Sequence, residues 1–104
     1  MDSTVVVIAD VTAKPEHAEQ LGAALEELAA ACRTEPGCRA YDLFRSTEQP
    51  ERFLSVEKYT DAAAFEAHRA AEHFTRIGLG TVVPLVETRD VQLFTGANSV
   101  PPKS

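Results

Sequence analysis

Two histidines and a glutamate carry the side chains with which this chain could do acid–base chemistry. His68 and His73 lie five residues apart, and Glu57 precedes them in a stretch where apolar and polar residues alternate. An imidazole exchanges a proton near neutral pH, and a carboxylate beside it can orient the ring. From the residues alone, each histidine could be a pocket base or a hydrogen-bonded core residue. Glu57 could be its partner or half of a structural ion pair.

The same histidines do not form a recognisable metal-binding pattern. Two histidines that share a zinc ion on one helix lie four residues apart, so that both rings point from one face. His68 and His73 would share a face only if the helix breaks between them. Cys32 and Cys38 lie six residues apart, which matches neither a redox pair nor half of a zinc site. We therefore expect two free thiols and no bound metal.

Hydrophobic periodicity predicts the elements that must position these residues. A helical pattern begins with Pro15 in its first turn and continues to about residue 33, and a second helix follows a cap at Thr60 or Asp61 and ends near residue 71. A weaker helical segment at 74–83 contains two glycines and is closed by Pro84. Strands are expected at 4–11, 38–45, 52–59 and 88–95.

The order β-α-β-β-α-β is typical of an α+β, ferredoxin-like plait with one antiparallel sheet and its helices on one face. We expect a single domain at 1–96 and a C-terminal tail at 97–104. The second strand carries Tyr41 and Leu43 on one face but Ala40 and Phe44 on the other. Helices can cover only one of these faces, so a two-fold homodimer that pairs sheet with sheet is the simplest way to cover the second.

Composition excludes several classes of function. Sixteen acidic and ten basic residues give a formal net charge of −6, and no cluster of Lys and Arg is present to bind a nucleic acid or an anionic membrane. No apolar run is long enough to cross a bilayer and no signal peptide is recognisable, so a cytoplasmic protein is expected. Nucleotide-binding glycine motifs and hydrolase signatures are also missing from the sequence.

The sequence also contains an ordered set of short motifs. They are Glu35-Pro36-Gly37-Cys38, Tyr41-Asp42, Arg45, Pro50-x-Arg52-Phe53, Glu57-x-Tyr59-x-Asp61 and Ala64-Phe65-x-x-His68-x-x-x-x-His73-Phe74. This ordered set resembles the antibiotic biosynthesis monooxygenase family of dimeric α/β barrels, and the resemblance covers roughly residues 5–96.

The resemblance implies a homodimer of ferredoxin-like subunits with one pocket in each. Many such members oxygenate phenols, anthrones or hydroquinones to quinones without flavin, haem or metal. It therefore implies a small aromatic substrate, O₂ and no cofactor. Carried onto this sequence, it implies that His73 or His68 is the base and that Glu57 orients it. The residues it implies for substrate binding are Tyr41, Arg45, Phe53, Tyr59, Phe65 and Phe74.

Two further functions are compatible with the same motifs. A relative that isomerises a small phosphorylated signal sugar has a similar Glu and His pattern, and that activity would need cationic pocket groups such as Arg45, Arg69 or Arg76. A non-enzymatic, stress-related binding dimer would use His68 and Glu57 as a buried structural pair. Haem degradation is disfavoured because the chain contains no Trp. The aromatic residues near the expected pocket favour the monooxygenase.

Overall fold

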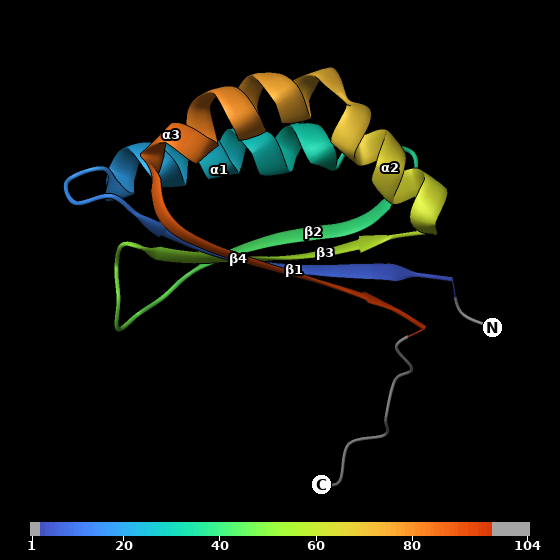
Figure 1. Cartoon of the computed structure of the whole chain (residues 1–104), viewed down its shortest axis with the longest axis horizontal. Coiled ribbons are helices and arrows are strands. Elements are labelled where there is room, and N and C mark those ends of the chain that lie inside the picture. The colour runs from blue at the N-terminus through green and yellow to red at the C-terminus, as the bar shows by residue number, and fades with distance from the viewer. Residues whose placement is uncertain (1–2, 97–104) are drawn as a thin grey trace, which may run out of the picture.

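Four antiparallel strands form one sheet in the order β2-β3-β1-β4, and the helices cover one of its faces (Figure 1). This computed structural model describes residues 3–96, so the predicted tail at 97–104 lies outside the described residues. The arrangement confirms the predicted α+β, ferredoxin-like plait. The elements are β1 (Val5–Ala13), α1 (Ala18–Cys32), β2 (Cys38–Arg45), β3 (Arg52–Tyr59), α2 (Ala62–Ala70), η1 (Phe74–Val82), α3 (Val83–Leu85) and β4 (Val86–Thr95).

The first helix begins later than the sequence pattern predicts. Residues 14–17 form a turn in which the N–H of His17 donates to the carbonyl of Lys14, and α1 starts at Ala18. Glu16 has φ of 70°, in the left-handed region, which a right-handed helix cannot include. Pro15 therefore lies in a turn before the helix, and the prediction that it opens the helix was wrong.

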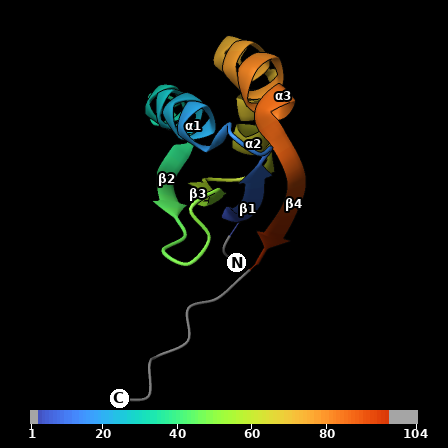
Figure 2. The same ribbon diagram turned by 90° about the vertical axis from the view of Figure 1, so that its left-hand side faces the viewer.

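The weak helical segment after α2 is a π-helix, η1. Its last turn shows the wider winding directly, because the N–H of Val83 donates to the carbonyl of Gly78 five residues earlier. Pro84 lies in the short α3 that follows. Figure 2 shows α1 on the β2 side of the helix layer, and α3, which continues η1, on the β4 side. Within the described residues, no helix is long and apolar enough to span a membrane.

The core lies between the helix layer and the sheet. The side chain of Leu21 on α1 is fully buried, and Tyr41 and Phe53 reach the same core from β2 and β3. The opposite face of the sheet has no helix over it. Phe44 on β2 and Phe94 on β4 have 53% and 43% of their surfaces exposed, so large apolar side chains remain in contact with solvent there.

Candidate active site

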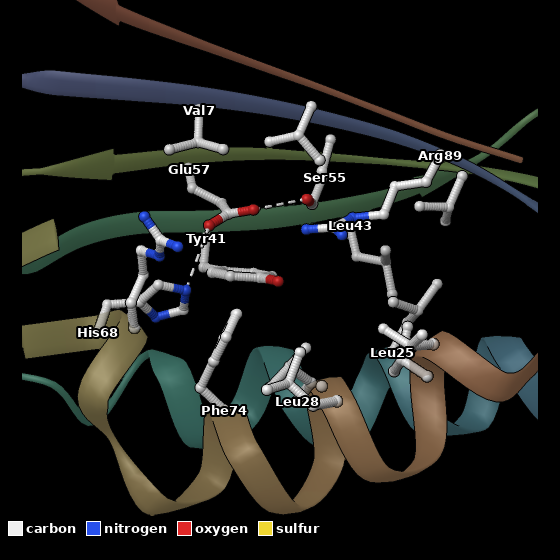
Figure 3. Close-up of a pocket in the computed structure, with 18 of the residues that line it drawn as sticks. Val7, Leu25, Leu28, Tyr41, Leu43, Ser55, Glu57, His68, Phe74 and Arg89 are labelled. Carbon is white, nitrogen blue, oxygen red and sulfur yellow. Dashed lines mark hydrogen bonds and ion pairs between the residues drawn. The ribbon is translucent and has the colours of Figure 1, made fainter. Parts of the chain in front are cut away.

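A cavity of about 780 Å³ lies between the sheet and the helices. Residues of all four strands line it on the sheet side, and residues of α1, α2, η1 and α3 line it on the helix side (Figure 3). Most of these side chains are aliphatic or aromatic, such as Val7, Leu25, Leu28 and Phe74. A mainly apolar space with a few polar groups is the usual form of a small-molecule site.

His68 and Glu57 face each other at one end of this cavity (Figure 3). The Nε2 atom of His68 lies 4.0 Å from Oε1 of Glu57, and both residues have only 4% of their surfaces exposed. Two hydroxyl groups satisfy the buried carboxylate: Ser55 donates to Oε2 and Tyr59 donates to Oε1, each at 2.7 Å. The strand register explains this pairing, because residues 55, 57 and 59 all point to the helix side of β3.

Aromatic rings hold the imidazole of His68 in place. The centroids of Tyr59, Phe74 and Phe65 lie 4.9, 5.1 and 5.9 Å from the centroid of the His68 ring. These rings come from β3, η1 and α2, so the histidine is fixed by three separate elements. Its Nε2 edge consequently faces the cavity and Glu57.

Glu35 lies behind His68 and joins the two histidines. Its Oε2 atom lies 3.1 Å from Nδ1 of His68, and Nε2 of His73 contacts the same oxygen. A carboxylate only accepts hydrogen bonds, so both ring nitrogens donate to it. His68 thus carries its proton on Nδ1 when neutral, and the lone pair of Nε2 is directed towards the cavity.

A break after α2 makes this meeting possible. The helix ends at Ala70, and Ala71 has an extended backbone with ψ of 145°, so His73 does not continue around the helix of His68. Sequence analysis named such a break as the condition for the two histidines to share a face. It included Glu35 in a family motif but assigned no role to its side chain.

The residues predicted to form the site fall into two groups: three do not line the cavity, and six do. Tyr59 is fully buried beneath Glu57, Arg45 forms an ion pair with Glu19 at 2.6 Å, and His73 contacts Glu35 outside the cavity wall. The others line the cavity: His68, Glu57, Tyr41, Phe53, Phe65 and Phe74.

Two arginines add positive charge to the cavity wall. Arg69 lies on α2, with its guanidinium carbon 5.9 Å from the centroid of Phe65, and Arg89 lies on β4 at the other end of the cavity from His68 (Figure 3). Within residues 3–96, neither arginine forms an ion pair. Sequence analysis missed Arg89, although its alternation with Val91 on the last strand could have placed it on the cavity side.

Burial keeps two phenols and one thiol beside Glu57 and Glu35 protonated. The pKa of Tyr59 and the pKa of Tyr41 are both raised well above the usual tyrosine range by burial and then by the charge of Glu57. The pKa of Cys32 is raised by burial and then by the charge of Glu35. Both phenols and this thiol are therefore neutral near pH 7 and can donate hydrogen bonds.

Four of the clustered side chains could hold a metal ion. One ligand atom from each of Cys32, Glu35, His68 and His73 lies within 4.8 Å of all the others. Both cysteines are free, as predicted.

The sequence matches the model of a known family over residues 4–78, and that family is described as antibiotic biosynthesis monooxygenase. The chain belongs to the antibiotic biosynthesis monooxygenase family. The matched part includes Glu35, Glu57, His68 and His73. The predicted family resemblance is thus confirmed.

Two proteins that are similar in sequence carry monooxygenase names. The chain is 36% identical over 74 residues to "Putative monooxygenase Rv0793" of Mycobacterium tuberculosis, which is 71% of this chain and 72% of the relative. It is 33% identical over 70 residues to "Putative monooxygenase YcnE" of Bacillus subtilis, which is 67% of this chain and 74% of that relative. These names support a monooxygenase-type function for the chain at a general level.

Solved structures show the same fold. The structure of Rv0793 superposes with a TM-score of 0.85 at 27% identity and covers 95% of this chain and 100% of that one. The crystal structure of PA3566 from Pseudomonas aeruginosa gives a TM-score of 0.84 at 34% identity, covering 94% and 98%. The ferredoxin-like architecture is therefore common to this antibiotic biosynthesis monooxygenase chain and its relatives.

Proposed function

We propose that the protein is a cofactor-independent monooxygenase that oxidises a small phenol, anthrone or hydroquinone to a quinone with O₂. One observation carries the proposal: the free Nε2 edge of His68 opens on a mainly apolar cavity that is large enough for a small aromatic molecule. The apolar side chains around this edge lower the local dielectric, which strengthens polar interactions made beside them.

His68 is the base in this proposal. Its Nδ1–H is held by Glu35, so Nε2 is the nitrogen that accepts the substrate proton. Glu57, 4.0 Å away, stabilises the imidazolium that results and restricts the ring from the opposite side. His73 is a positioning residue, because it holds the oxygen of Glu35 that orients His68.

The reaction balances without an added reductant. For an anthrone, the base removes one proton, and the resulting anion passes one electron to O₂. The substrate radical and superoxide then combine to form a carbon–oxygen bond. The peroxide takes up a proton, loses the second C–H proton of the same carbon, and breaks its O–O bond. The products are one quinone and one water, so both oxygen atoms of O₂ are accounted for.

The remaining cavity residues suit an aromatic substrate. The rings of Phe53, Phe65 and Phe74 can pack against a planar molecule, and the neutral hydroxyl group of Tyr41 can donate to a developing oxyanion. The backbone positions of these residues are fixed by β3, α2, η1 and β2.

Oxygen uptake by EDTA-treated protein tests the proposal. The protein is assayed with a panel of anthrones and dihydroxynaphthalenes, and His68→Gln is compared with His17→Gln. His17 lies just before α1 and forms a hydrogen bond with Gln20 on the surface, away from the cavity. We expect EDTA-resistant uptake that falls at least about 100-fold in His68→Gln, as expected for loss of a general base, and is retained in His17→Gln. Uptake unchanged in His68→Gln, or equal to the uncatalysed background with every compound, contradicts the proposal.

Isomerisation of a small phosphorylated sugar is the second candidate. The observation that favours it is the pair Arg69 and Arg89 in the cavity wall, because guanidinium groups bind phosphate. His68 would then move a proton between carbons and would consume no O₂. Absence of oxygen uptake together with turnover of a phosphorylated sugar, lost in Arg89→Gln, favours this function. If neither substrate class is turned over, a binding dimer remains.

A homodimer through the open face of the sheet is part of the proposal. Phe44 and Phe94 lie exposed on this face, and a second copy related by a two-fold axis would cover both. Light scattering is expected to give twice the mass of the chain, and Phe44→Glu is expected to yield monomers. Ala30→Glu, which adds the same charge to the exposed side of α1, is expected to leave the dimer intact. A monomeric wild-type protein at micromolar concentration contradicts this.

A further inference from the structure

We propose that Cys32, Glu35, His68 and His73 together form a zinc-binding site directly behind the cavity wall. The four residues supply one thiol, one carboxylate and two imidazoles, and the structure holds one ligand atom of each within 4.8 Å of the others. They come from the end of α1, the turn that follows it, α2 and the residue just before η1.

The distances suit a tetrahedral ion after small side-chain movements. Zinc bonds of 2.0–2.3 Å place neighbouring ligand atoms roughly 3.3–3.8 Å apart in a tetrahedron. Oε2 of Glu35 and Nδ1 of His68 are already 3.1 Å apart, and Nε2 of His73 contacts the same oxygen. Closing the longest separation, which is at most 4.8 Å, requires movements of about 1 Å.

The donor set and its surroundings point to zinc rather than to a hard cation. Thiolate and imidazole ligands favour zinc, whereas calcium and magnesium favour sites made of oxygen alone. Cys32 is fully buried, and the side chains of Glu35 and His73 have 12% and 17% of their surfaces exposed. Such a site is nearly closed, and an ion would enter it from solvent beside His73, the most exposed of the four side chains.

Glu35 provides an independent indication. Its Oε1 atom is buried and has no hydrogen-bond partner among the described residues. A buried carboxylate oxygen without a partner is destabilising, and a bound cation would neutralise the carboxylate that carries it. The cluster therefore contains one buried carboxylate oxygen without a hydrogen bond, on the side chain whose other oxygen contacts both histidines.

Zinc at this site would also change what His68 does in the cavity, a consequence that rests on the proposed function. An ion bound at Nδ1 takes the lone pair of that nitrogen, so the proton of the neutral ring moves to Nε2. Nε2 then donates towards Glu57 instead of accepting a proton from a substrate. The zinc-bound protein should accordingly be inactive in oxygenation, and chelation should restore activity.

Metal binding is tested on the full chain after EDTA treatment and removal of the chelator. Titration calorimetry with zinc is expected to give one ion per chain, and cobalt(II) is expected to give a thiolate-to-cobalt absorption band. Cys32→Ser should abolish the band, and His73→Gln should weaken zinc binding at least about tenfold. Two matched controls, Cys38→Ser and His17→Gln, replace the same residue types outside the cluster and should bind zinc like the wild type.

Circular dichroism checks that each variant is folded, and His73→Gln serves as the informative variant if Cys32→Ser is not. Failure of the wild type to bind zinc stoichiometrically overturns the site, as does binding that survives both Cys32→Ser and His73→Gln. Oxygen uptake in the EDTA-treated protein separates the two proposals. Zinc binding without any uptake supports the site and contradicts the oxygenase, and uptake without zinc binding does the reverse.

Discussion

Replacing Gly37 by alanine should destabilise the fold at the contact between β2 and α2. A Cβ atom at Gly37 would lie 2.4 Å from Cβ of Ala64 and 3.3 Å from its Cα. Neither atom belongs to a flexible side chain, so the backbone of the β2 start or of α2 must move. Overpacking of this kind costs about 1–3 kcal/mol. For a chain of this size, each kcal/mol lowers the melting temperature by roughly 4–8 °C.

Urea and thermal unfolding at equal protein concentrations measure this effect. Gly80→Ala is the matched control, because its added Cβ meets only the carbonyl of Thr75 at 3.5 Å. Alanine in a helix is better than glycine by about 0.8–1.0 kcal/mol, so the control should be neutral or stabilising. The reasoning also predicts rescue: Ala64→Gly should be less harmful in the Gly37→Ala background than alone. Strictly additive effects, or a Gly37→Ala variant as stable as the control, would refute it.

Three further predictions concern ionisation. The pKa values of Tyr41 and Tyr59 are both raised in the fold, so the absorbance of tyrosinate should not rise near pH 10 while the protein is folded. The free energy of unfolding should fall above that pH, because the phenols ionise only in the unfolded chain. A normal tyrosine titration in folded protein would contradict this. The pKa of Asp10 is lowered by its hydrogen bond from Arg52, so this pair stabilises the fold above about pH 4. Asp10→Asn should therefore be slightly less stable than wild type at pH 7, and the difference in urea midpoint should shrink as the pH falls towards 2. Burial and the raised pKa of Cys32 should protect it from thiol reagents until the protein unfolds, and labelling of two cysteines at the same rate in folded protein would oppose that expectation.

The sequence predicted the strands better than the helix starts. Alternation fixed β2 and β3 at their observed bounds, because residues such as Phe53 and Tyr59 must reach the core while their neighbours do not. The start of α1 depended on a positive φ at Glu16, a residue type that gives no warning of it. Local propensity therefore favoured a helix that the turn at this position excludes.

The candidate site shows a similar division. Glu57 and His68 could be predicted to face inward from strand alternation and helical spacing. The role of Glu35 could not, because it meets His68 across 33 residues of sequence through a turn whose proline and glycine dominate its local pattern. The side chain that joins the two histidines was visible only after the fold had brought the end of α1 beside α2.

The cavity wall is divided along the chain in a way that matters for engineering. The acid–base residues lie at positions 35–73, whereas Leu79, Val82, Val91 and Leu93 line the cavity from the last quarter of the chain, in η1 and β4. A combinatorial library restricted to these four positions would alter the shape and selectivity of the cavity while leaving every contact of the histidine–glutamate cluster unchanged. Substitution at these four positions is thus a route to changing substrate preference apart from the acid–base residues.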